Sequence, residues 1–86
     1  KMKVQELLDE YARVLESQPP EYFGGMATHQ SGREVATKML DAIHRTNYPA
    51  DWLTHNKALK TACKKFGITR SSELRVLVKD EWMPAR

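Results

Sequence analysis

The chain has 86 residues, a formal net charge of +3 and a single cysteine. This length suits one domain with a modest core, and one cysteine excludes both an internal disulfide framework and a metal site built from several cysteines. No apolar run approaches membrane-spanning length and no signal peptide pattern opens the chain, so we expect a cytoplasmic or nuclear protein without a membrane partner. Residues 1–86 are expected to form one compact helical domain, either a small protein or a module excised from a larger one.

Positive and negative charges are segregated along the chain. Residues 57–79 contain seven Lys and Arg residues and one acid, Glu73, whereas five acids lie within the first 25 residues. Lysines often serve only to keep a helix face in water, but such a face usually carries carboxylates at neighbouring helical positions, and this one does not. The basic stretch therefore indicates a polyanionic partner.

The first predicted element is a helix over residues 3–17. Apolar residues from Val4 to Leu15 follow the i, i+3, i+4, i+7 rhythm, and the acids between them, Glu10 included, are expected on the exposed face. Two prolines at 19–20 end this helix because proline cannot donate to the helical hydrogen-bond ladder.

Residues 18–30 are predicted to form a loop, because they contain two prolines and two glycines. Its apolar residues either cover the core or form an exposed binding loop: Tyr22, Phe23 and Met26. The second helix begins at Ser31, which forms a capping box with Glu34, and it ends near Arg45.

A third helix is expected from Asp51, as its N-cap, to Phe66. Thr54 and Asn56 are further possible caps, and either would divide this segment into a short turn and a new helix. The apolar residues of its second half share one arc, and the opposite arc carries Lys57, Lys60 and Lys64, with Lys65 to one side. Gly67 follows, where a helix commonly ends in a left-handed residue.

The last element, over residues 72–82, fits either a helix or a strand. As a helix it buries Leu74, Leu77 and Val78. It would also place Glu81 on the inner face, which favours an end near Lys79 or Asp80. As a strand it would alternate apolar and polar residues. We therefore expect an all-α, four-helix domain in which a short strand is the alternative for the last element.

The segment from Leu59 to Val78 resembles the helix-turn-helix of bacterial regulators. The small residue Cys63, the turn residue Gly67 and the apolar Ile68 match that pattern, which is broken at Glu73. The run LKTACKKFGI is also similar to the first helix of a SAP-type DNA-binding module. The helix-turn-helix resemblance implies that the element after Gly67 enters the major groove of DNA.

The predicted function is therefore nucleic-acid binding, DNA rather than RNA, through residues 56–79. The lysines before the turn would clamp phosphates, and the start of the last element adds hydroxyl groups and helix N-terminal amides that favour anions. The alternative is a protein–protein interaction or assembly domain of a larger protein. The candidate contact residues are Lys57, Lys60, Lys64, Lys65, Arg70, Ser71, Ser72, Arg75 and Lys79.

Features typical of enzymes are missing from the sequence. The three histidines share no metal-ligand spacing with one another or with Cys63, and no glycine-rich phosphate loop occurs. Because Cys63 falls on an apolar helical arc, we expect it to act as a small buried hydrophobe. We therefore expect no enzyme, no cofactor and no metal.

Overall fold

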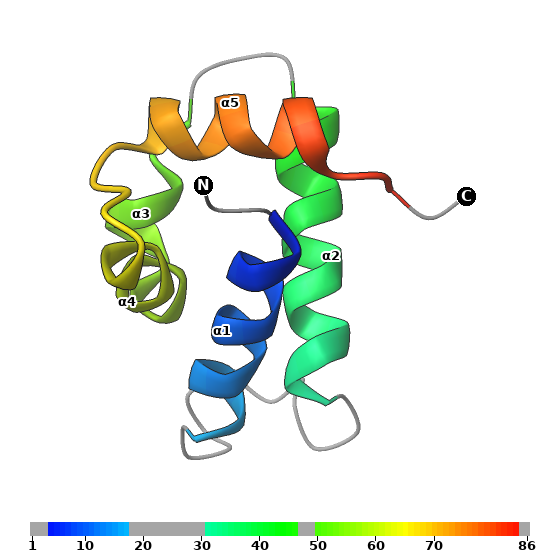
Figure 1. Ribbon diagram of the computed structural model, residues 1–86, viewed down its shortest axis with the longest axis vertical. Coiled ribbons are helices and arrows are strands. Elements are labelled where there is room, and N and C mark those ends of the chain that lie inside the picture. Colours follow the sequence, from blue (N-terminus) through cyan, green and yellow to red (C-terminus); the bar gives the residue numbers. More distant parts are fainter. Residues whose placement is uncertain (1–3, 18–30, 47–49, 85–86) are drawn as a thin grey trace.

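A computed structural model describes residues 4–17, 31–46 and 50–84, and this part of the chain is all-α (Figure 1). It contains five helices and no strand, which confirms the predicted fold class and the helical alternative for the last element. The predicted loop over 18–30, with Tyr22, Phe23 and Met26, lies outside the described residues. The helices are α1 (Val4–Glu16), α2 (Gly32–Arg45), α3 (Trp52–His55), α4 (Lys57–Lys65) and α5 (Ser71–Glu81).

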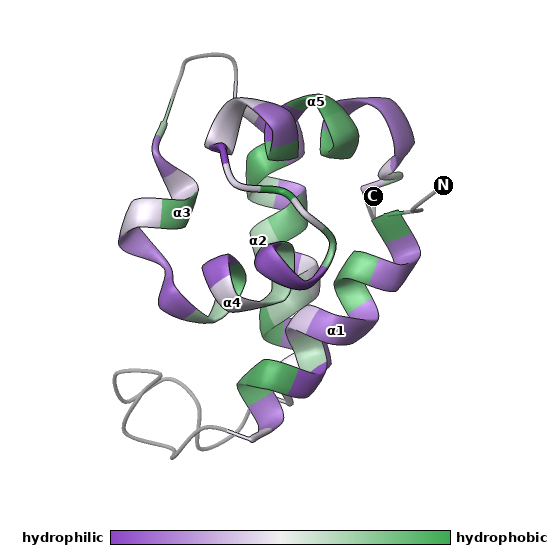
Figure 2. Ribbon diagram, turned by 60° about the vertical axis from the view of Figure 1, so that its left-hand side comes forward, coloured by the Kyte–Doolittle hydropathy of each residue, from purple (hydrophilic) through white to green (hydrophobic). Residues whose placement is uncertain are grey.

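Helices α1 and α2 run side by side, and α5 lies across one end of the pair (Figure 1). Helix α4 packs on α1, and α5 packs mainly on α2. Hydrophobic and hydrophilic residues alternate along α1 and α2, as expected of helices that bury one face (Figure 2). The largest completely buried side chains come from every helix except the short α3: Leu7, Tyr11, Leu40, Ile43, Leu59, Cys63, Leu74 and Val78. No helix in the described ranges is both long enough and apolar enough to cross a membrane.

The first residue of α2, Gly32, lies close to α1. The predicted capping box is present, since the Ser31 hydroxyl accepts from the Glu34 amide and the Glu34 carboxylate accepts from the Ser31 amide. The next amide, Gly32 N–H, donates to Glu16 Oε2 at 2.6 Å. An acid at the end of α1 thus satisfies a backbone donor at the start of α2, which ties the two helices together.

The expected continuous helix from Trp52 to Phe66 is wrong and the alternative with a break at Asn56 is confirmed, because Asn56 divides the segment into α3 and α4. Asn56 Oδ1 accepts from the Leu59 amide at 3.0 Å, and Asn56 Nδ2 donates to the Tyr11 hydroxyl at 2.9 Å. The first contact is an N-cap for α4, and the second anchors that cap on α1. Asp51 caps α3 as predicted, since its carboxylate accepts from the Thr54 amide.

The predicted end of α5 near Lys79 or Asp80 is also wrong, because the helix continues to Glu81. The inward-facing Glu81 carboxylate accepts from the Val4 amide at 2.8 Å, so it satisfies one of the unpaired donors at the start of α1. The following residue, Trp82, donates its indole N–H to Asp41 Oδ1 of α2 at 2.6 Å. The end of α5 is therefore bound to both long helices.

Candidate nucleic-acid interface

Three of the predicted contact residues form one exposed face on α4. Lys57, Lys60 and Lys64 are exposed, whereas Ala58 and Leu59 on the other side of the helix are buried in the core. The ion pairs among the described residues involve none of these three lysines. We call this set the lysine face of α4.

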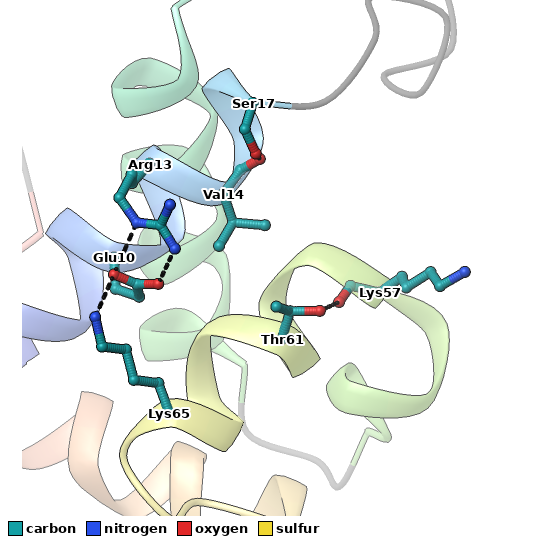
Figure 3. A network of polar contacts seen from close by, with 7 residues as sticks. All are labelled: Glu10, Arg13, Val14, Ser17, Lys57, Thr61 and Lys65. Carbon is teal, nitrogen blue, oxygen red and sulfur yellow. Dashed lines mark hydrogen bonds and ion pairs between the residues drawn. The ribbon is translucent and has the colours of Figure 1, made fainter.

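Lys65 differs from the lysine face because its ammonium group is engaged within the fold. It lies 3.3 Å from Glu10 Oε1 of α1, and Arg13 binds the same carboxylate through two nitrogens (Figure 3). The expectation of an exposed Glu10 is wrong, since this residue is only 8% exposed. Its burial is tolerated because two cations hydrogen-bond to the carboxylate.

This pairing predicts a specific dependence of stability on pH. The hydrogen bond from Arg13, followed by the contact with Lys65, lowers the pKa of Glu10 from 4.5 to about 2, although burial acts in the opposite direction. A lowered carboxyl pKa stabilises the fold at pH values above 4.5, and this contribution is lost as the pH falls towards 2. We expect wild type to be more stable than Glu10→Gln at pH 7, with the gap closing near pH 2. Urea unfolding at both pH values measures the difference in stability between the two proteins. A difference of the same size at both pH values would contradict the lowered pKa of Glu10.

Most other acids of the described part also have hydrogen-bond or ion-pair partners, none of which belongs to the lysine face. Asp9 pairs with Arg33, and Asp51 accepts from the hydroxyls of Thr54 and Ser71. The remaining engaged carboxylates bind backbone amides or the Trp82 indole: Glu16, Glu34, Asp41, Glu73 and Glu81. The positive charge of α4 is therefore left largely uncompensated.

The turn between α4 and α5 ends α4 as predicted, but backbone amides of the turn already bind the carboxylate of Glu73. Gly67 has φ +78, in the left-handed region. At the start of α5 the N-cap position is Arg70. Glu73 accepts from the amides of Thr69 and Arg70, at 3.2 and 3.3 Å. These two amides, which we had expected to favour a phosphate, thus already bind a carboxylate.

The remaining predicted contacts lie on α5 and differ in accessibility. The Ser71 hydroxyl accepts from the Leu53 amide at 3.1 Å and donates to Asp51 at 2.8 Å, so it joins α5 to α3. Ser72 and Arg70 are exposed, and Arg75 and Lys79 are half-buried. An open hollow of about 440 Å³ runs along this helix, and its described lining consists of Ser72, Arg75, Val76, Lys79 and Asp80.

The packing of α5 bears on the helix-turn-helix resemblance. Leu74 and Val78 bury the inner face of α5 completely, and α5 packs mainly on α2 rather than on α4. The residue at the position where the resemblance breaks, Glu73, is exposed and binds the turn amides. The entry of α5 into a major groove stays a prediction.

A second, smaller hollow lies beside the lysine face and was not predicted from the sequence. Its volume is about 170 Å³, and its lining combines two lysines with residues of α3 and the turn: Leu53, Lys60, Lys64, Ile68 and Thr69. Periodicity along one helix gave no signal for this hollow, because its walls come from three separate segments.

The chemistry of Cys63 differs from that of a nucleophile. The side chain is completely buried, and burial raises the pKa of its thiol to about 12. Such a thiol stays protonated at neutral pH and is unreactive. Within the described ranges, no three His, Cys, Asp or Glu side chains are arranged to hold a metal ion.

Comparisons with protein-family models, with curated proteins and with solved structures give no match to this chain. Its function is therefore inferred from its own residues.

Proposed function

We propose that this domain binds nucleic acid, DNA rather than RNA, through contacts between its basic surface and the phosphate backbone. The observation that carries the proposal is the lysine face of α4, with three exposed ammonium groups that form no ion pair with a described carboxylate. Lysines in such an arrangement bind phosphates by charge, without reading sequence.

Further cations lie in the turn before α5 and along α5 itself. Arg70 follows the turn, and Arg75 and Lys79 lie with Ser72 along the open hollow of α5. Of these residues, Arg75 and Arg70 are the best suited to read a base edge, because a planar guanidinium group can form paired hydrogen bonds. Lys65 and Ser71 are left out of the proposed interface, because contacts within the fold already use their polar atoms.

Fluorescence anisotropy with labelled duplex and single-stranded DNA tests the proposal. For roughly four or five neutralised phosphates, the slope of log K against log[salt] is expected to be about −4. A protein that binds neither DNA at low salt contradicts the proposal and leaves the domain to a protein partner.

A charge-matched pair of variants separates the lysine face from overall charge. Lys60→Gln combined with Lys64→Gln removes two positive charges, and Lys38→Glu on the exposed surface of α2 changes the net charge by the same amount. We expect the double variant to reduce the salt slope to about −2 and to weaken binding at low salt about tenfold or more. Lys38→Glu should alter binding only slightly. Equal effects of both would mean that overall charge, and not this face, governs binding.

A protein partner remains the second candidate, and a specific observation favours it. Val76 is 68% exposed and Met83 is 85% exposed, both at the C-terminal end of the described residues. Single exposed apolar side chains are common on protein surfaces, and exposed apolar side chains also occur at docking surfaces. Met83 lies outside the described lining of the α5 hollow, so DNA binding that survives Met83→Ser would separate this apolar position from the proposed interface.

A further inference from the structure

The smaller hollow combines an apolar floor with a positively charged rim. Leu53 of α3 and Ile68 of the turn form the floor, and both are nearly completely buried. Lys60, Lys64 and Thr69 complete the lining, and all three are exposed. Figure 1 shows α3, α4 and the turn that follows α4 together on one side of the molecule. No acidic residue is part of the described lining.

A ligand suited to this hollow has an apolar body with negative charge attached close to it. Lys60 and Lys64 are one helical turn apart, about 6 Å along the axis, which is comparable to the separation of neighbouring phosphates along one strand. The apolar floor can contact the face of a base, and the Thr69 hydroxyl can donate to or accept from a base edge. A nucleotide within a strand meets all of these requirements.

Whether a single strand or a duplex suits the hollow depends on where the bases lie. In a duplex the bases are paired and stacked inside, so only phosphates can reach the rim of the hollow. In a single strand a base can leave the stack and enter an apolar pocket at a small cost. We infer that the hollow receives one unpaired base of a single strand, while the adjacent phosphates contact Lys60 and Lys64. This inference rests on the proposed function and specifies its ligand.

An acidic peptide with an aliphatic side chain would also combine apolar and negative groups. The basic surface, however, continues beyond the hollow to Lys57, about 4.5 Å further along the axis of α4. Cations repeated along one helix face suit a polymer with one charge per unit better than a peptide of irregular charge. The repeated lysines of α4 therefore favour a nucleic acid as the ligand.

Three fluorescent probes with equal numbers of phosphates test the inference on the wild-type protein. They are a thymidine single strand, a single strand of the same length made of abasic sites, and a duplex of half that length. We expect the thymidine strand to bind about tenfold more tightly than either of the others. Equal binding of the abasic strand would overturn the inference and leave the proposed function intact. Failure of all three probes to bind would overturn both.

A variant that fills the hollow provides the second arm. Thr69→Leu adds apolar volume without changing charge, and the Thr69 amide that donates to Glu73 is retained. We expect thymidine-strand affinity to fall to the level of the abasic strand, whose own affinity stays unchanged. Ala42→Leu on the exposed surface of α2 is the matched control and should alter neither affinity.

Thr69→Leu with undiminished preference for the thymidine strand would overturn the inference. So would a labelled acidic peptide with one leucine that binds more tightly than the thymidine strand and is weakened by Thr69→Leu, because the hollow would then serve a protein.

Discussion

Replacing Gly32 with alanine is expected to lower the free energy of unfolding by about 2 kcal/mol, because the new Cβ has no room between α1 and α2. A Cβ at Gly32 would lie 2.7 Å from the Ala12 carbonyl oxygen and 2.8 Å from Glu16 Cγ. The Glu16 side chain can rotate away, at the cost of its hydrogen bond to the Gly32 amide. The carbonyl belongs to the backbone of α1, so it can move only if the helix pair separates. Urea unfolding followed by circular dichroism measures the loss.

Gly67, the other glycine in the described part of the chain, is the matched control. Its backbone conformation, and not a lack of space, makes alanine unfavourable there. A Cβ at Gly67 would meet no atom within 4 Å, but the residue has φ +78. Gly67→Ala should therefore cost about 1 kcal/mol through backbone strain alone, and Gly67→Asn should recover part of it. The Gly32 variant should in addition shift the NMR signals around Ala12. A Gly32→Ala variant as stable as wild type would contradict the close approach of α1 and α2.

Asn56→Ala is expected to lower the free energy of unfolding by about 2 kcal/mol, of which about 1 comes from the lost N-cap and about 1 from the lost hydrogen bond. The amide side chain makes both contacts, to the Leu59 amide and to the hydroxyl of Tyr11, which is almost completely buried. Alanine removes the oxygen that accepts from the Leu59 amide at the start of α4. It also removes the nitrogen that donates to the Tyr11 hydroxyl on α1.

Two further variants separate these contributions. Asn56→Ser keeps a capping oxygen but is too short to reach Tyr11, so it should lose only about 1 kcal/mol. Tyr11→Phe removes the same hydrogen bond from the other side, and the double variant with Asn56→Ala should cost less than the sum of the single variants. Strict additivity in this cycle would mean that the hydrogen bond contributes nothing to stability.

The sequence predicted best those features that depend only on residues close together in the chain. The apolar rhythm of α1, the capping box at Ser31 and the left-handed Gly67 each depend on residues within one or two turns. Such signals survive folding because neighbouring residues meet in any helix. The lysine face of α4 belongs to the same group, since helical periodicity alone separates its exposed lysines from the core.

Asn56 marks the limit of these local rules. Both a continuous helix and a break were compatible with the sequence around it, because Asn is a good cap but is also tolerated within helices. The break is supported by Tyr11, 45 residues earlier in the chain, whose hydroxyl accepts from the Asn56 side chain. A contact over that distance in sequence leaves no trace in the pattern near Asn56.

What the sequence by itself determined is the helical class, most helix ends and the lysines of α4 that face outward. Only the tertiary structure decided which polar groups are used inside the fold. It buried Glu10 against Arg13 and Lys65, and it turned Glu81 towards the start of α1. It also formed the small hollow from three segments. The physical reason is that periodicity reports which face of a helix is apolar, whereas a carboxylate or a hollow depends on partners that other helices supply.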